Sequence, residues 1–244
     1  MYIISQSETI SRIYQSLENT KDLLVSSLIY GEAHVGKKSM VSKLYKESIW
    51  VSGENLKDIQ KALNESSYVV ITNFEKVTDL DFLDFENSNI VAICNSKTIS
   101  SRLEDKFAFI YHIPSLRERE DDVKLFSKEY IEEAKKIYNI DKEVEIDSSD
   151  IDISKNLKSL KSSIYKSVLL KNLDKSDIYK ILYNYFYNNY EGSNIYKEHL
   201  EIFEKALLSA GLDIYKSQLK LSDVLGINRN TLRKKINEQL WNRL

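Results

Sequence analysis

Residues 31–40 read "GEAHVGKKSM", and this segment decides how the first half of the chain folds. It has the G-x-x-x-x-G-K frame of a loop that wraps a phosphate between a strand and the following helix. Gly31, Gly36 and Lys37 fill the fixed positions of that frame. Lys38, however, stands where such a loop normally has a Ser or Thr that holds magnesium. The segment therefore predicts a phosphate-binding loop without its usual metal ligand.

The sequence around this loop alternates strand-like and helix-like stretches. The apolar runs "LLVSSLIY", "YVVIT" and "NIVAICN" are short, and helical spacing appears between them in "KKSMVSKLYKES" and "ENLKDIQKALNE". Short apolar runs between amphipathic helices are typical of parallel strands that are buried on both faces. After Pro114 the patterns are helical. We therefore expect an α/β fold with a parallel sheet in the first half and an all-helical second half.

The composition excludes several classes of protein. The chain has 244 residues, a formal net charge of -2, three histidines and one cysteine, Cys94. A slightly acidic chain has no overall positive field, so any contact with nucleic acid has to be local. The histidines and the cysteine lack metal-ligand spacing, and no apolar run approaches the roughly 18 residues that span a membrane. We expect a cytoplasmic protein with no metal site and no membrane contact.

The segment "SQLKLSDVLGINRNTLRKKINEQLW" near the C-terminus carries the most specific signal. The helix before it is expected to end at Gly211, and Gly226 is expected to form a tight turn between two short helices. Leu232 and Ile236, four residues apart, lie on one face of the second helix and are expected to pack against the core. The apolar face of the first is expected to comprise Leu219, Leu221, Val224 and Leu225.

The other face of the second short helix is polar and basic. Its residues are Asn228, Arg229, Asn230, Thr231, Arg233, Lys234 and Lys235. Cations suit DNA phosphates, and Asn and Arg can reach base edges in the major groove. The alternative is a solvated basic helix end that the helix dipole favours. Because the cations begin at the N-terminus of the helix, where the dipole favours acids, the pattern favours a helix-turn-helix that binds double-stranded DNA.

Two segments resemble one family of regulators. "LGINRNTLRKKI" (225–236) resembles the helix-turn-helix of the Fis family, and the longer run 200–236 resembles the Fis-type C-terminal domain of NtrC-like enhancer-binding proteins, the AAA+ activators of sigma-54 RNA polymerase. "IPSLRERE" and the "DDV" after it (113–123) resemble the signature that opens the helical lid of that family. The resemblance implies a reduced AAA+ P-loop core, a helical lid and a Fis-type domain, with no receiver domain before them. It also implies that a helix over 196–210 helps to pair two subunits.

The resemblance divides the chain into four expected segments. These are an AAA+-like α/β subdomain (1–112), a helical lid (113–172), a linker helix (173–193) and a Fis-type helix-turn-helix domain (194–244). The polar stretch 188–194 is the best candidate for a flexible linker. The four charged residues at 117–120 are expected to form a solvated turn with local ion pairs.

The resemblance also implies a nucleotide site that has kept phosphate-binding positions and lost catalytic ones. The vestigial nucleotide-binding positions are Gly31, Gly36, Lys37, Lys38, Asn95 and Lys158. Thr72 and Asn73 stand where the family has the Asp that holds magnesium and the Glu that polarises water. Glu75 lies two residues beyond that glutamate position and is expected on a different side of the strand end. The family's G-A-F-T-G-A loop is missing, and Arg102 does not match its arginine finger. We therefore expect no ATP hydrolysis, no catalytic residue and no required cofactor, and leave ATP or ADP binding open.

Three functions fit these expectations. The favoured one is a sequence-specific DNA-binding transcriptional regulator on a degenerate AAA+ scaffold, acting as a homodimer or small homo-oligomer. The second is a protein-interaction subunit that modulates an active AAA+ protein or RNA polymerase, with the Tyr-rich helix "IYKILYNYFYNNY" as its surface; ordinary core packing is the alternative for that helix. The third is a switch that binds ATP without hydrolysing it.

Overall fold

The computed structural model describes residues 5–23, 25–81, 83, 85 and 88–238. The chain splits into two compact units, Met1–Asn172 and Leu173–Leu244. The stretch 188–194, the linker candidate, lies between two helices of the second unit. Within the described residues, no helix combines the length and the apolar character needed to cross a membrane.

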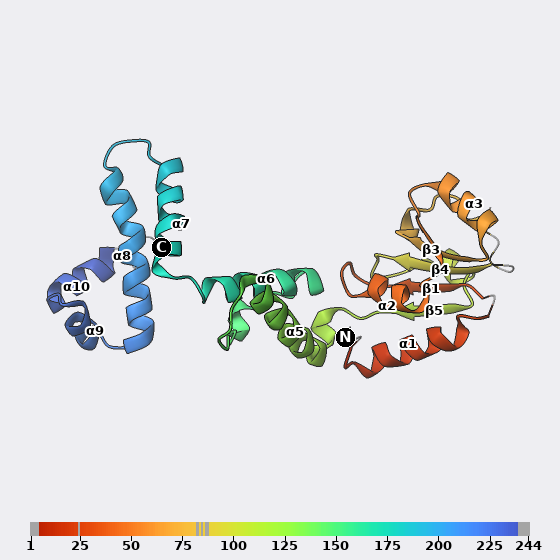
Figure 1. The fold of residues 1–244 in the computed structure, drawn as a ribbon, viewed down its shortest axis with the longest axis horizontal. Helices are drawn as coiled ribbons and strands as arrows, with labels where there is room; N and C mark the ends of the chain where they lie inside the picture. Colours follow the sequence, from red (N-terminus) through yellow and green to blue (C-terminus); the bar gives the residue numbers. More distant parts are fainter. Residues whose placement is uncertain (1–4, 24, 82, 84, 86–87, 239–244) are drawn as a thin grey trace. The chain divides into compact units, whose positions relative to one another are not determined.

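The first unit is built on a five-stranded parallel sheet (Figure 1). Its strands are β1 (Ser27–Tyr30), β2 (Ile49–Ser52), β3 (Tyr68–Thr72), β4 (Asn89–Cys94) and β5 (Phe109–His112). They lie in the order β2-β3-β4-β1-β5, with Ile29 of β1 opposite Ile93 of β4. Strand β4 is buried along its whole length, as expected for a strand covered on both faces. The predicted parallel sheet is confirmed.

Helices cover both faces of this sheet. They are α1 (Glu8–Thr20), α2 (Lys37–Leu44), α3 (Leu56–Glu65) and the short α4 (Ser101–Glu104). Side chains alternate between the faces of a strand, so Val70 packs in the cluster that contains Val41 of α2, whereas Ile71 packs in the cluster that contains Ile59 of α3. The sheet therefore has α1 and α2 on one face and α3 on the other (Figure 1). In an open parallel sheet of this kind, ligands bind beyond the carboxyl ends of the strands.

The remainder of the first unit is a helical lid, which we define as α5 (Glu120–Tyr138) and α6 (Leu157–Leu170). Its core contains Leu116, Phe126, Ala134, Leu160, Ile164 and Val168. The charged turn before α5 was expected to be solvated, but part of it is buried. Arg119 is buried and donates to Asp122 at 3.0 Å. The Asp122 carboxylate also accepts bonds from the backbone N–H groups of Gln6 and Ser7, ahead of α1. This pair is buried because it joins the lid to the start of the first unit.

The second unit contains α7 (Lys175–Asn188), α8 (Ile195–Tyr215), α9 (Gln218–Leu225) and α10 (Arg229–Ile236). Two expectations are corrected there. Gly211 does not end α8, which continues to Tyr215; a Cβ at Gly211 would lie 2.4 Å from Leu221 Cδ1, so the glycine allows α9 to pack closely. Leu219 and Val224 are exposed, because α9 turns Leu221 and its polar neighbour Ser222 inward.

Candidate functional site

The phosphate loop, residues 31–36, joins the end of β1 to the start of α2. Its path requires glycine at two points. Gly31 has φ of +149°, and a Cβ there would lie 2.4 Å from the carbonyl oxygen of Ile113. Gly36 has φ of +106°, in the left-handed region, immediately before the helix. The first and last fixed glycines of the sequence motif are therefore required by the backbone.

Lys37 follows the loop, and its side chain turns back into it. The Nζ atom donates to the carbonyl oxygens of Gly31 at 2.8 Å and Glu32 at 2.6 Å. An ammonium has three N–H donors, so one is left for a ligand. Burial lowers the pKa of Lys37 to about 8, and the negative charge of Glu75 is the largest effect that opposes this shift. Lys37 is therefore still mostly protonated at neutral pH.

The lid binds the other carbonyl groups of the loop. Asn156, which precedes α6, donates through Nδ2 to Ala33 O at 3.0 Å, and the N–H of Leu157 donates to His34 O at 3.2 Å. Arg119 Nη2 donates to Val35 O at 2.9 Å. We call Asn156, Leu157 and Arg119 the lid clasp. Together with Lys37, the clasp satisfies five successive carbonyl groups, those of residues 31–35.

The loop is arranged to hold an anion at the N-terminus of α2. In the described part of the chain, the N–H groups of Gly36, Lys37 and Lys38 have no hydrogen-bond acceptor. Such N–H groups at the start of a helix bind phosphate well, because they point at the ligand and lie at the positive end of the helix dipole. A loop with its carbonyls occupied, three N–H groups available and a buried ammonium has the chemistry of a phosphate site.

The end of β3 has no carboxylate, as the sequence indicates. The Thr72 hydroxyl donates to Val51 O of the neighbouring strand at 3.2 Å, and Asn73 accepts from Asn95 Nδ2 at 3.1 Å. No group of three His, Cys, Asp or Glu side chains suited to a metal occurs among the described residues. Glu75 was expected on a different side of the strand end, but it lies near the same Asn95 side chain as Asn73. Its carboxylate turns toward the end of β4, where Oε2 accepts the N–H of Asn95 at 3.0 Å.

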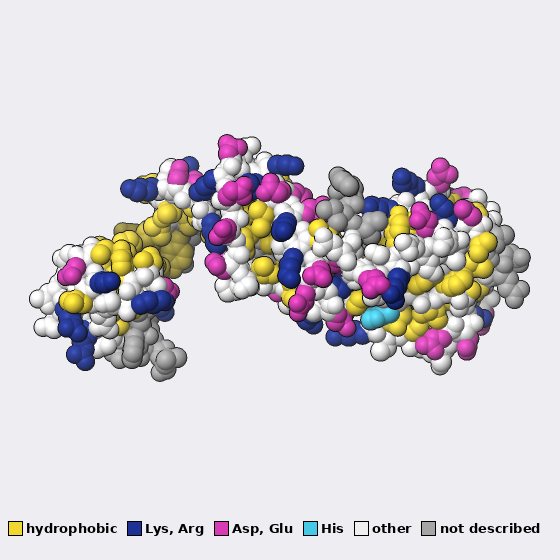
Figure 2. Space-filling model, turned by 90° about the horizontal axis from the view of Figure 1, so that it is seen from below, with side chains coloured by type: hydrophobic (Ala, Val, Ile, Leu, Met, Phe, Trp, Pro, Cys, Tyr) yellow, Lys and Arg dark blue, Asp and Glu magenta, His cyan; other side chains and the backbone are white. Residues whose placement is uncertain are grey.

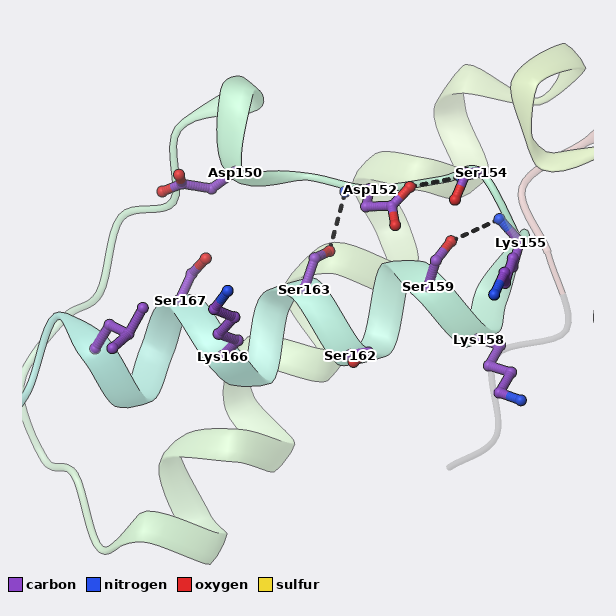
Figure 3. Close-up of a pocket in the computed structure, with 11 residues that line it drawn as sticks. Asp150, Asp152, Ser154, Lys155, Lys158, Ser159, Ser162, Ser163, Lys166 and Ser167 are labelled. Carbon is purple, nitrogen blue, oxygen red and sulfur yellow. Dashed lines mark hydrogen bonds between the residues drawn. The ribbon is translucent and has the colours of Figure 1, made fainter. Parts of the chain in front are cut away.

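Lys38 and Lys158 are less engaged than the other predicted nucleotide-binding residues. Both are exposed, and among the described residues neither side chain is hydrogen-bonded to the loop. Lys158 lies at the first turn of α6 beside an open hollow of about 710 Å³ (Figure 3). Asp152, Ser159 and Ser163 lie on the other side of the helix from the Lys158 side chain (Figure 3). Because acids and lysines both line the hollow, its charge favours no single class of ligand.

In the second unit, α10 has one buried and one exposed face. Leu232 and Ile236 are buried in the core with Leu208 and Leu221. Asn228 caps the helix by accepting the N–H of Asn230 at 2.8 Å. The exposed residues from the predicted set are Asn228, Arg229, Asn230, Thr231, Arg233 and Lys234.

Two residues change the predicted basic surface. Lys235 is half-buried and forms an ion pair with Glu204 of α8, so it faces the protein. Gln218, at the start of α9, lines a hollow of about 500 Å³ with Arg229, Asn230 and Arg233. Gln218 was not among the predicted residues, although its place directly after the N-cap Ser217 marks it as the first residue of a helix. We call Gln218, Arg229, Asn230, Arg233 and Lys234 the basic surface.

Comparisons with known proteins show the fold. No family model matches the chain, and no curated protein matches it by sequence. Among solved structures it is similar to NtrX from Brucella abortus in complex with ATP, with a TM-score of 0.54 and 13% identity over 98% of this chain and 69% of that one. The ADP complex of NtrX gives a TM-score of 0.51 at 12% identity, over 98% and 70% of the two chains. The chain thus shares their fold: an α/β core with a parallel sheet, which carries the phosphate loop, and a helical region after it.

Proposed function

We propose that this chain is a sequence-specific DNA-binding regulator of transcription, and that α9 and α10 are its helix-turn-helix. The observation that carries the proposal is the two-faced character of α10. Its apolar residues Leu232 and Ile236 are buried, while Arg229, Asn230 and Arg233 are exposed beside Gln218. A protein with a net charge of -2 that gathers cations on one short helix has a local surface for phosphate.

The basic surface suggests a division of roles. Arg229 and Asn230 lie in the first turn of α10, which is the part of a recognition helix that reaches base edges in the major groove. Arg233 and Lys234 lie one turn further on and are suited to phosphates. Lys235 is excluded from the surface by its pair with Glu204. Lys234 also contacts Glu238, at 3.8 Å, but both side chains are exposed and such a surface pair is weak, so Lys234 can still turn to DNA. Three cations are therefore available to DNA, one fewer than the sequence indicates.

We further propose that the regulator is a homodimer that pairs through α7 and α8. None of the residues of α7 is buried within the chain, although most of the helix is apolar. Tyr179, Tyr183 and Tyr187 form an exposed stack with ring centroids 6.2 and 6.1 Å apart. Exposed apolar side chains continue on α8: Tyr196, Ile202, Phe203, Leu207 and Ile214. Figure 2 shows hydrophobic side chains gathered at the surface of this unit. A large exposed apolar surface of this kind normally marks a site of interaction with another protein.

The test of DNA binding uses the full chain and its salt dependence. Replacing Arg233 and Lys234 together with alanine should weaken binding to all DNA sequences and make the slope of log affinity against log salt shallower by about 2, because each phosphate contact contributes about 0.9. Lys128→Ala with Lys136→Ala is the matched control, since both lysines are exposed on α5 and the charge change is the same. If both double variants bind alike, the basic surface is not the DNA site.

An interaction subunit for an active AAA+ protein or RNA polymerase is the competing proposal. It uses the same apolar surface of α7 and α8 but places a different protein on it. Sedimentation of the purified chain separates the two ideas. A dimer that Tyr183→Ser dissociates supports pairing between copies. A chain that sediments as a monomer supports the competing proposal, in which a different protein covers α7 and α8.

A second function, nucleotide binding without hydrolysis, is supported by the phosphate loop. The unused donor of Lys37 and the unpaired N–H groups at the start of α2 fit a phosphate. NtrX, which has a similar fold, has been crystallised with ATP and with ADP. Hydrolysis is not proposed, because β3 supplies no carboxylate for metal or water. Calorimetric titration of the chain and of Lys37→Ala with ADP tests this; equal heats from both proteins would rule out binding at the loop.

A further inference from the structure

Glu75 places a negative charge beside the phosphate loop. It lies just after β3, and its carboxylate reaches the end of β4, the strand that pairs with β1. The phosphate loop begins at the end of β1. The carboxyl ends of these three parallel strands meet at one edge of the sheet, which is where ligands of such sheets bind. Glu75 is thus at the ligand edge, although it lies outside the G-x-x-x-x-G-K motif.

Hydrogen bonds hold this carboxylate in place. The N–H of Asn95 donates to Glu75 Oε2 at 3.0 Å, and Asn95 Nδ2 lies 3.5 Å from Glu75 Oε1. The same Nδ2 donates to Asn73 Oδ1 at 3.1 Å. The donors of Asn95 are therefore already engaged with groups of this chain. A ligand phosphate that reached Asn95 would have to displace the carboxylate.

The charge of Glu75 acts on Lys37. Among the charged groups around Lys37, Glu75 has the largest effect on its pKa, ahead of Lys38 and Glu32. In loops of this frame, the lysine reaches the β- and γ-phosphates of a nucleotide. The Lys37 ammonium and the Glu75 carboxylate both lie at the carboxyl ends of neighbouring strands, which is where the terminal phosphate of a bound nucleotide would sit. The two anions repel each other there, because the end of β3 offers no metal-binding carboxylate to bring in a compensating cation.

We propose that the phosphate loop prefers a nucleoside diphosphate to a nucleoside triphosphate, with Glu75 as the residue that excludes the third phosphate. The inference rests on the nucleotide binding proposed above. It does not depend on DNA binding. The diphosphate meets Lys37 and the free N–H groups of α2, whereas a triphosphate brings its most highly charged group against Glu75.

Titration calorimetry of the full chain with ADP and with ATP, each in EDTA and in Mg²⁺, tests the inference. The wild type should bind ADP at least about tenfold more tightly than ATP in EDTA, since the repulsion between two like charges in contact near a protein surface exceeds the thermal energy severalfold. Glu75→Gln should bring the two affinities together by strengthening ATP. Glutamine keeps an oxygen that can accept the N–H of Asn95, so the strand ends should be preserved. Glu65→Gln is the matched control, because Glu65 is an exposed glutamate at the end of α3.

The outcomes separate this inference from the nucleotide proposal. A wild type that binds both nucleotides equally, with no change in Glu75→Gln, overturns the selectivity and leaves nucleotide binding intact. A Glu75→Gln variant that binds ATP more weakly in Mg²⁺ also overturns it, because Glu75 would then help to hold a metal. If neither protein binds either nucleotide, both proposals fail. Equal melting temperatures of wild type, Glu75→Gln and Glu65→Gln establish that the comparison is between folded proteins.

Discussion

Replacing Asn156 tests whether the lid clasp stabilises the first unit. The Asn156 side chain is buried and makes three hydrogen bonds: it accepts the Leu116 N–H at 2.7 Å and donates to Glu32 Oε2 at 2.9 Å and to Ala33 O at 3.0 Å. Its φ is +53°, so Asn156→Gly removes the bonds without straining the backbone. At about 1 kcal/mol for each bond, the free energy of unfolding should fall by about 3 kcal/mol.

Two further variants separate the side chain from the backbone. Asn156→Ala should lose about 1–2 kcal/mol more than Asn156→Gly, because alanine resists a positive φ. Asn139→Gly is the matched control. Asn139 also has φ of +53°, at the end of α5, and its side chain has no hydrogen bond to the described residues. Its replacement should change the free energy of unfolding by no more than about 0.5 kcal/mol.

Urea unfolding followed by Trp50 fluorescence measures these differences in the first unit. Trp50 lies on β2, and Trp241, which lies outside the described residues, is replaced by phenylalanine in every protein of the series. Hydrogen exchange of the Leu157 amide, which donates to His34 O, reports the clasp directly and should become faster in Asn156→Gly. A loss below about 1 kcal/mol, or one equal to that of Asn139→Gly, would refute the reasoning.

Three further predictions concern the loop and the second unit. Nucleotide affinity should fall as pH rises through about 8, because burial depresses the pKa of Lys37 to that value and the neutral amine no longer attracts phosphate; titrations between pH 7 and 9.5 measure this. The same shift makes the folded state bind fewer protons than the unfolded state between about pH 8 and the ordinary lysine pKa of 10.5, so the cost of burying the ammonium is fully present below pH 8 and is relieved as pH rises through that window. Gly211→Ala should destabilise the second unit by about 1–3 kcal/mol in thermal unfolding, since the new methyl meets a leucine of α9 at 2.4 Å. Lys235→Met should leave the salt slope of DNA binding nearly unchanged because Glu204 already holds this lysine, whereas Arg233→Met should make it shallower by about 0.9.

The sequence predicts the elements of the first unit well because its signals are local. The G-x-x-x-x-G-K frame fixes the turn from β1 to α2, and short apolar runs indicate strands buried on both faces. The lid clasp could not be predicted in the same way. Asn156 bonds with the loop across more than 120 positions of sequence, and no periodicity reports such a contact.

The corrections at individual residues have a common cause. Lys235 and Arg233 have the same charge and lie two residues apart, yet α10 presents them on different sides, and only the position of Glu204 on α8 shows that Lys235 is paired. Glu75 was expected on another side of the strand end, and the N–H of Asn95 draws it toward β4. Composition and spacing describe a helix face or a strand end. They do not predict which residue from another part of the chain a side chain contacts in the folded structure.

The lid clasp also has a consequence for the order of events during synthesis. A nascent chain that has emerged only as far as β5 already contains the whole phosphate loop, but its Ala33 and His34 carbonyls still face water. Their partners, Asn156 and Leu157, leave the ribosome only after α5. Because contacts between distant positions form late, the loop takes its final shape together with the lid, in one of the last steps of folding the first unit.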